Sequence, residues 1–417
     1  MNSPKISFNK KSQAWTFIYF SEAFEFLNNK AISRGDLNYQ EGAVKCIHYG
    51  DILTKFPQIL YSYSPLLPYV NDDVDVENVS TLKTGDIVIA DTAEDYAVGK
   101  SIEVSITDDS KVIAGLHTMP CRPKKNFASG FLGYYINSTA YHGQLRRLVT
   151  GTKVYSINKS EIRKTKLHFP CVEEQQKIAA FFTALDKKIS LVEKSIAILE
   201  SQKKELLRRI FCRELKLKDK DGNYYPEWKS AKLSELFYCI RNGFVGTIAP
   251  FYTDKENGVR YLQGTNIHNG NIDDSVEYYV SKEFNEKHSK NILKPTDLLV
   301  VQSGHVGDCA VVGNYAGANC HALIILSNSG KCSSGFVKYY FLSSVGKRNI
   351  SLIETGNTIK HILASDLSKM TIPLPCLQEQ ADINQFFEFI DERLKIKNKY
   401  LKMLKLKKKG FMQQMFV

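Results

Sequence analysis

Two stretches of the chain carry the hydrophobic spacing of long coiled-coil helices. Their apolar residues alternate steps of four and three, interrupted by Lys203 in the first stretch and by Lys397 and Lys408 in the second. The apolar positions are Ile178, Phe182, Leu185, Ile189, Val192, Ile196, Leu199, Leu206 and Ile210, then Ile383, Phe387, Ile390, Leu394, Leu401, Leu404, Phe411 and Met415. This pattern predicts two helices of some forty residues, each about 60 Å long, that bury their apolar seams against one another.

The two stretches are copies of one another. Identical residues recur 205 positions later without a gap, and they are Pro170, Cys171, Glu174, Gln175, Ile178, Phe181, Phe182, Asp186, Lys203, Lys204 and Phe211. The segments that precede them are also related, since Ser129–Tyr135 matches Ser334–Tyr340 and Trp15 matches Trp228. A repeat of this length indicates two copies of one architectural unit. A plain dimerisation arm would not need to occur twice in one chain.

The repeat predicts the order domain, helix, domain, helix. We place a first globular domain at residues 1–168, a first helix at 169–213, a second domain at 214–373 that opens with a linker at 214–227, and a second helix at 374–417. The expected fold class is α+β. Two mixed α/β domains are each followed by a long helix, and the two helices pack antiparallel as a coiled-coil spacer with pseudo-two-fold symmetry.

Composition narrows the class of partner. The 417 residues are 43% hydrophobic and carry a formal net charge of +12, which favours an acidic partner such as nucleic acid. The nine cysteines form no Cys-x-x-Cys pair and are odd in number, as is typical of free thiols in a reducing compartment. No apolar run is long enough for a membrane span and the N-terminus has no signal-peptide core, so a cytoplasmic location is expected.

Several phrases carry a family resemblance. Both halves contain Pro-x-x-x-Glu-Gln-x-x-Ile-x-x-Phe-Phe-x-x-Leu/Ile-Asp, the linker ends in Tyr-Pro-Glu-Trp, and residues 297–312 read Asp-Leu-Leu-Val-Val-Gln-Ser-Gly-His-Val-Gly-Asp-Cys-Ala-Val-Val. With these motifs the chain resembles the specificity subunits of type I restriction-modification systems. The first half departs from the pattern, because residues 91–100 replace the Ser-Gly-x-x-Gly loop.

The resemblance implies a function. Each globular segment would be a target-recognition domain that reads one half of a split, asymmetric sequence in double-stranded DNA, and the helices would be a spacer and a docking surface. The implied partners are two methyltransferase subunits and two restriction/translocase subunits. They would bind S-adenosylmethionine, ATP and magnesium, so that this chain itself needs no cofactor.

Candidate DNA contacts are polar residues in turns, since amide, hydroxyl, imidazole and guanidinium groups match the edges of bases. In the second domain they are Gln263, Thr265, Asn266, His268 and Asn269, then Gln302, Ser303 and His305, then Gly356, Asn357 and Lys360. In the first domain they are His48, Tyr49, Lys124, Lys125, Asn126, Arg146, Arg147 and Lys153. Phosphate contact is the expected role of the lysines and arginines.

Other repeated residues suggest structural or partner roles. Glu174 and Gln175, with their counterparts Glu379 and Gln380, are expected either to cap their own helices or to bind partner subunits. Lys203 and Lys408 interrupt the seams at equivalent positions, which favours a role in fixing helix register or a snorkelling conformation. On that hypothesis, replacing both by leucine would raise the melting temperature.

The sequence contains no recognisable catalytic motif and no set of residues with metal-ligand spacing, so no catalytic or metal-binding residue is predicted. Two other interpretations stay open. One is an enzyme of unfamiliar type that acts on nucleic acid, and the other is a coiled-coil scaffold protein without sequence readout.

Overall fold

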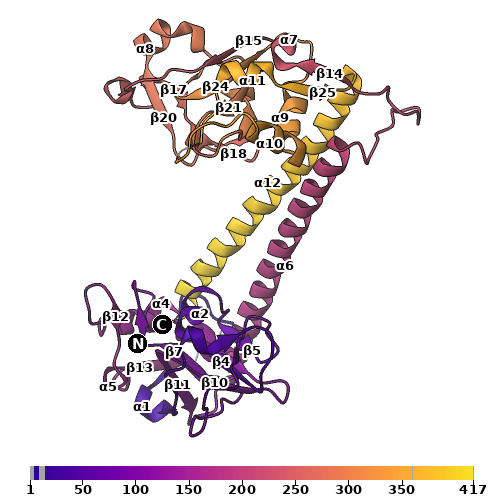
Figure 1. Ribbon diagram of the computed structural model, residues 1–417. Helices are drawn as coiled ribbons and strands as arrows, with labels where there is room; N and C mark the ends of the chain where they lie inside the picture. Colours follow the sequence, from indigo (N-terminus) through magenta and orange to yellow (C-terminus); the bar gives the residue numbers. More distant parts are fainter. Residues whose placement is uncertain (1–3, 9–14, 359, 417) are drawn as a thin grey trace. The chain divides into compact units, whose positions relative to one another are not determined.

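The computed structural model describes residues 4–8, 15–358 and 360–416. The chain forms two compact units, of which the first combines residues 1–193 with 399–417 and the second consists of residues 194–398. Helices α6 (Val172–Phe211) and α12 (Leu377–Gln414) contain 40 and 38 residues, so the two long helices predicted from the sequence are confirmed. Each helix contributes one end to each unit (Figure 1).

The first globular domain is built on two sheets. A five-stranded sheet has the order β2-β11-β7-β9-β5, and a four-stranded sheet has the order β10-β4-β6-β3. The strands are β2 (Phe24–Phe26), β3 (Leu37–Asn38), β4 (Val44–Ile47), β5 (Ile59–Tyr61), β6 (Tyr69–Val70), β7 (Ile87–Ala90), β9 (Ser101–Ser105), β10 (Lys111–Ala114) and β11 (Thr118–Pro123). The central strand β7 is an unbroken apolar run and is fully buried, as expected for a strand covered on both faces.

Short strand pairs and helices complete this domain. The pairs are β1 (Thr16–Tyr19) with β13 (Lys166–Phe169) and β8 (Thr92–Ala93) with β12 (Tyr155–Ser156). The helices are α1 (Phe20–Ala23), α2 (Tyr49–Thr54), α3 (Phe131–Tyr135), α4 (Thr139–Arg146) and α5 (Lys159–Ile162). The β1–β13 pair joins the start of the domain to the strand that leads directly into α6, so the helix leaves the domain from a fixed position.

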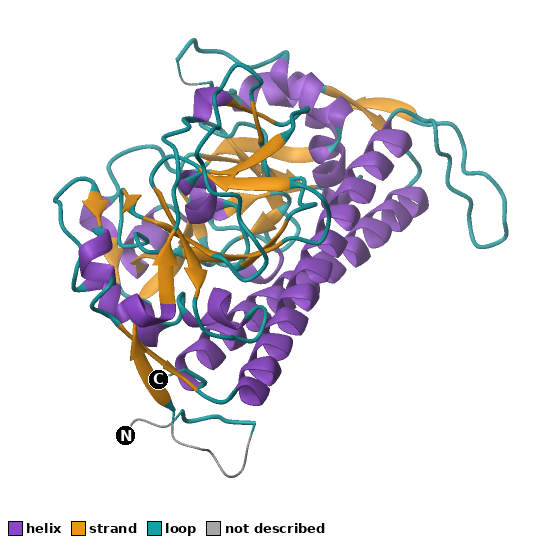
Figure 2. Ribbon diagram, turned by 90° about the horizontal axis from the view of Figure 1, so that it is seen from below, coloured by secondary structure: helices purple, strands orange, loops and turns teal. Residues whose placement is uncertain are grey.

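The second domain repeats the mixed α/β plan. Its sheets have the orders β15-β24-β21-β22 and β16-β20-β17-β23, and β14-β25 and β18-β19 are two-stranded. The strands are β14 (Lys229–Lys232), β15 (Phe237–Asn242), β16 (Tyr252–Thr253), β17 (Gly258–Leu262), β18 (Ile267–His268), β19 (Asn271–Ile272), β20 (Tyr278–Ser281), β21 (Leu298–Val301), β22 (Cys309–Val311), β23 (Asn319–Cys320), β24 (Leu323–Asn328) and β25 (Thr371–Leu374). The helices are α7 (Leu233–Leu236), α8 (Lys282–Lys287), α9 (Ser334–Leu342), α10 (Ser344–Ser351) and α11 (Ala364–Lys369). Figure 2 separates strands, helices and loops by colour and shows how much of this fold is loop.

Within each unit, the start of one long helix packs against the end of the other, so the helix ends are antiparallel. In the first unit Phe181 at the start of α6 meets Phe411 near the end of α12, with ring centroids 5.0 Å apart. In the second unit Lys203 near the end of α6 pairs with Asp391 in the first half of α12. All the predicted seam residues are buried or half-buried, as the seven-residue pattern requires.

An aromatic side chain at the tip of each long helix completes the core of the unit it reaches. Phe211, the last residue of α6, packs against Trp228, Phe336 and Tyr340 of the second domain. The repeat reproduces this arrangement in the first unit, where Phe416 packs against Trp15, Phe131 and Tyr135. Phe211 and Phe416 are both 4% exposed, so each domain core is closed by a residue from a helix that does not follow that domain directly in sequence.

The seam lysines are paired with aspartates. Lys203 forms a short ion pair with Asp391, which also accepts from the Tyr339 hydroxyl at 2.8 Å. In the first unit Lys408 lies 2.6 Å from Asp186, which accepts from the Tyr134 hydroxyl at 2.9 Å. This pairing supports the role in fixing register. It also changes the sign expected for the leucine variants. Replacing either lysine by leucine should lower the melting temperature, because it would leave a partly buried carboxylate without its cation.

The expectation that Glu174, Gln175, Glu379 and Gln380 bind partner subunits is corrected, because all four are at most 4% exposed inside their own units. The Gln175 amide accepts from the Ala128 N–H and donates to the Pro170 carbonyl. Gln380 makes the same two bonds with the Ser333 N–H and the Pro375 carbonyl. Glu174 accepts from the Phe8 N–H, and Glu379 accepts from the Trp228 indole and the Arg213 guanidinium. These side chains attach the start of each long helix to its domain.

Candidate nucleic-acid interface

Three loops of the second domain come together although they lie far apart in the sequence. They are residues 263–269, residues 302–308, and residues 355–358 with 360–361. The His305 Nε2 lies 3.0 Å from the Gly264 carbonyl and 3.2 Å from the Ile267 carbonyl, which joins the first loop to the second. The second loop is joined to the third through an isolated bridge between Ser303 and His361, which also bridges Thr355. The sequence predicted candidates in each loop, and the structure places them on neighbouring segments.

Most of these candidates are exposed. The exposed residues are Thr265, His268, Asn269, Ser303, His305, Gly356, Asn357 and Lys360, whereas Gln263 and Gln302 are half-exposed. Gln263 is already engaged, because its amide donates to the Tyr252 hydroxyl at 2.7 Å. The loop cluster therefore presents hydroxyl, amide, imidazole and amino groups to solvent.

Asn266 must be removed from the list of candidates. It is 1% exposed. Its Oδ1 accepts from the Gln263 N–H, and its Nδ2 donates to the carbonyls of Asp273 and Val276. Since the amide is fully used in holding the turn, it has nothing to offer a base.

The equivalent region of the first domain is built differently. His48 is 6% exposed and accepts from the Gly50 N–H at the start of α2, so it is a helix cap rather than a base-reading group. Burial, together with the Arg34 guanidinium 3.4 Å away, lowers the pKa of His48 and favours its neutral form. The candidate role of His48 in DNA contact is therefore corrected.

The neighbouring Tyr49 ring meets the ring of His117, with centroids 5.2 Å apart. His117 lies within 3.3 Å of both the Asp91 carboxylate and the Thr92 hydroxyl. Sequence reasoning missed His117, Asp91 and Thr92, because this half lacks the glycine loop that marks the equivalent segment of the second half. The positive φ of His117, +51°, becomes visible only in the folded chain.

The remaining basic candidates of the first domain fall in two places. Arg146 and Arg147 lie at the end of α4 and are exposed. Lys153 is also exposed, and it lies in the loop that leads into β12, the strand that pairs with β8 directly after Asp91. Lys124, Lys125 and Asn126 follow the far end of β11, and Lys124 donates to the Ser21 carbonyl. A six-residue strand is about 20 Å long, so these three residues are separated from His117, which precedes the same strand. The structure thus does not bring them to the Tyr49 surface.

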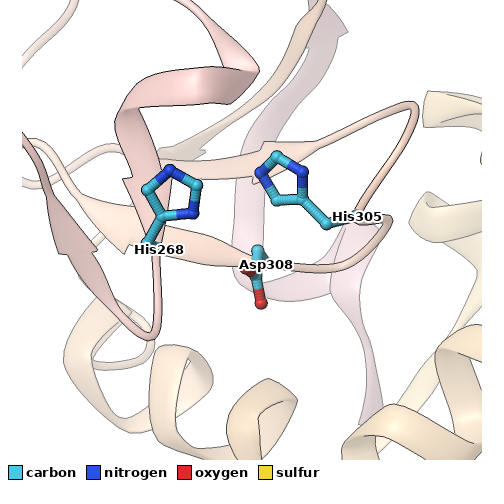
Figure 3. Close-up of side chains that lie close together, drawn as sticks. All are labelled: His268, His305 and Asp308. Carbon is cyan, nitrogen blue, oxygen red and sulfur yellow. The ribbon is translucent and has the colours of Figure 1, made fainter. Parts of the chain in front are cut away.

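One group among the described residues has the chemistry of metal ligands. His268, His305 and Asp308 each place a ligand atom within 4.8 Å of the others (Figure 3). His305, however, already directs Nε2 at two carbonyl oxygens, which accept hydrogen bonds and cannot donate, so this nitrogen carries a proton. Its Nδ1 remains available, so the group offers three ligand atoms, one fewer than the four of a structural zinc site.

The chain thus contains two related domains with different polar loops, and each domain is anchored to the ends of two long helices. A family model described as type I restriction modification DNA specificity domain matches residues 13–201 and 225–406. The chain belongs to this family. It is accordingly the DNA-specificity subunit of a type I restriction-modification system, a non-catalytic recognition subunit that works in complex with other subunits.

Individual relatives agree with this assignment. A protein of Methanocaldococcus jannaschii named as the MjaX type I restriction enzyme specificity subunit is 26% identical over 358 residues, covering 83% of this chain and 81% of the relative. The EcoKI specificity subunit of Escherichia coli is 24% identical over 340 residues, covering 76% of this chain and 70% of the relative.

Solved structures show the same fold. The S subunit of a type I restriction-modification system from M. genitalium matches with a TM-score of 0.61 and 14% identity, covering 100% of this chain and 99% of that one. A chain from a study of complex assembly in the type I system matches with a TM-score of 0.57 and 18% identity, covering 97% and 98%. The predicted fold class is thereby confirmed. No helix in the described part of the chain combines the length and apolar character needed to cross a membrane.

Proposed function

We propose that each globular domain reads one half of a bipartite, asymmetric target in double-stranded DNA. The observation that carries this proposal is the convergence of three polar loops in the second domain, joined by the His305 ring and by main-chain hydrogen bonds. Reading bases requires donors and acceptors held in fixed positions, since a mobile side chain loses rotamer entropy when it binds.

In the second domain, the exposed side chains of Thr265, His268, Asn269, Ser303 and Asn357 are the proposed base-reading groups. Lys360 is assigned to phosphate contact, and Gly356, with φ of +93°, allows the backbone to approach DNA closely. Gln302 and Gln263 lie at the edge of the same surface.

In the first domain, Tyr49 is proposed to face the bases together with His117. Arg146, Arg147 and Lys153 are proposed to contact phosphates, because they are exposed cations of the same domain. Lys124, Lys125 and Asn126 are left out because of their position at the other end of β11. Since the two surfaces carry different side chains, the two half-sites should differ in sequence.

The long helices are proposed to be the spacer and the docking site for two methyltransferase subunits. Besides the seam, α12 carries the exposed apolar residues Phe389, Ile396 and Met403 at seven-residue intervals, and α6 carries Leu191 and Ile198 with the same interval. An apolar stripe outside the internal seam is typical of a further helix-packing surface. In this proposal S-adenosylmethionine binds to the methyltransferase subunits, and ATP with magnesium binds to two restriction/translocase subunits.

Domain exchange tests the proposal. The chain is purified with its methyltransferase partners, and the methylated sites are mapped on genomic DNA before and after residues 15–168 are replaced by the corresponding domain of a related subunit. One half of the target should change while the other half and the gap stay the same. The matched control exchanges residues 228–373 and should change the opposite half. A change in both halves after one exchange, or methylation without sequence preference, would refute the proposal.

A further inference from the structure

His268, His305 and Asp308 bring one ligand-type atom each to within 4.8 Å of one another. His268 belongs to β18, and the other two belong to the loop between β21 and β22 (Figure 3). The two imidazole rings are stacked with centroids 5.1 Å apart and an interplanar angle of 22°. Asp308 lies in the same loop as His305 but is not among the residues that the sequence singled out.

Backbone carbonyls fix which nitrogen of His268 is protonated. The His268 Nε2 lies 2.8 Å from the Thr265 carbonyl. A carbonyl oxygen only accepts, so Nε2 carries the proton and Nδ1 of the neutral ring keeps its lone pair. His268 therefore presents an acceptor to its surroundings. The Asp308 carboxylate is a second acceptor close by.

The positions of these acceptors are fixed by main-chain hydrogen bonds. The Asp308 carbonyl accepts from the Val301 N–H at 2.7 Å, and the Gly307 N–H donates to the Val301 carbonyl at 3.1 Å, which closes the loop tightly. The hairpin of β18 and β19 is attached to β22 through a bridge between Gly270 and Ala310. His305 acts here as a positioning residue, since its Nε2–H spans two carbonyls of the other loop.

We propose that His268 and Asp308 read a base that donates from its groove edge, namely the exocyclic amino group of cytosine or adenine. In the major groove, cytosine N4 and adenine N6 are the amino donors, whereas guanine O6 and thymine O4 only accept. Two neighbouring acceptors favour cytosine and adenine and repel guanine and thymine. This inference rests on the proposed function, because it names the chemistry of one position in the half-site of the second domain.

A divalent metal ion is the competing occupant of the same space. It fits less well, since Nε2 of both histidines is committed to carbonyls and leaves Nδ1 of each ring and the Asp308 carboxylate as three ligands, whereas structural zinc sites use four. The hydrogen bonds that close the equivalent loop of the first domain place Ala97 and Lys100 at the positions of His305 and Asp308, so the arrangement belongs to the second domain alone.

The experiment selects DNA from a duplex library randomised in both half-sites, with the full chain and its methyltransferase partners. The variants are Asp308→Asn and His268→Ala. The matched control is Asp273→Asn, which makes the same chemical change in the adjoining turn on a carboxylate already satisfied by the N–H and hydroxyl of Ser275. Zinc binding by the chain without DNA is measured in parallel, with the same variants.

In the half-site of the second domain, the wild type should select cytosine or adenine at one position. Asp308→Asn and His268→Ala should reduce that preference by roughly 5- to 150-fold, the range for one good base contact. The control should leave it unchanged, and the other half-site should not respond. Three results would overturn the inference. The first is selection of guanine or thymine at every position that responds to Asp308, and the second is an effect of the control as large as that of Asp308→Asn. The third is saturable zinc binding that requires Asp308. Loss of selection in both half-sites by the wild type would instead count against the proposed function.

Discussion

The ion pair between Lys203 and Asp391 gives the sharpest prediction for the stability of the fold. Its two side chains are 13% and 14% exposed, so little water is available to either charge if the other is removed. Breaking a buried pair on one side costs about 3–5 kcal/mol, and the residual exposure places Lys203→Leu near the lower end, at about 3 kcal/mol. The Tyr339 hydroxyl keeps its bond to Asp391, but a phenol does not replace a cation.

A double-mutant cycle separates the pair from its surroundings. The cycle compares the unfolding in urea of Lys203→Leu, Asp391→Leu and the double variant. Circular dichroism and tryptophan fluorescence are both followed, because the two units can unfold in separate transitions. The double variant should be more stable than Lys203→Leu alone, with a coupling energy of about 2 kcal/mol.

The repeat supplies a matched pair in the first unit. Lys408 and Asp186 are 16% and 28% exposed, so Lys408→Leu should cost less, about 1–2 kcal/mol. If Lys203→Leu raised the urea midpoint, or if the coupling energy were indistinguishable from zero, the pairs would not be what holds the helices in register.

Three further predictions concern other parts of the molecule. Gln380→Ala leaves the Ser333 N–H without an acceptor and should destabilise the second unit by about 1–3 kcal/mol in urea titrations, whereas the exposed neighbour Gln378→Ala should cost less than 0.5 kcal/mol. Burial raises the pKa of Glu103 to about 7 although the Gly130 and Gly133 N–H groups donate to it. The folded state therefore binds this proton more tightly, and stability should fall as pH rises from about 4.5 to 7, by on the order of 3 kcal/mol in total. Glu103→Gln should flatten that slope in melting curves, and an unchanged slope would refute the assignment. Ile396→Ser should weaken methyltransferase binding at least about tenfold in calorimetry and leave the melting temperature within a degree or two; equal binding would argue against the proposed docking stripe.

Much of this architecture could be predicted because it depends on periodicity and duplication. The seam residues, the order of domains and helices, and the polar loops of the second domain all have local signatures in sequence. The roles of single polar residues did not follow. Gln175 and Asn266 look like surface residues in sequence, yet both are buried because distant backbone groups need their amides. His48 looks like a base-reading residue but caps a helix.

The contribution of Asp308 could not be found from sequence either. It depends on which nitrogen of His268 and His305 is protonated, and that depends on carbonyls brought close by tertiary folding. The lysines in the seam were correctly singled out, but the sign of their effect required their partners. Asp391 stands 188 residues after Lys203, and no local pattern connects them.

The placement of Phe416 has a consequence for the order in which the chain can fold. The second unit is one continuous segment, residues 194–398, and all its core residues are available once that segment has been made. The first unit is interrupted, because the core around Trp15 and Tyr135 is closed by the side chain of Phe416, which is synthesised only after the whole second unit. During translation the first domain must therefore wait, with an apolar gap in its core, until the second unit is complete. The part of the protein that is made first is the last to be finished.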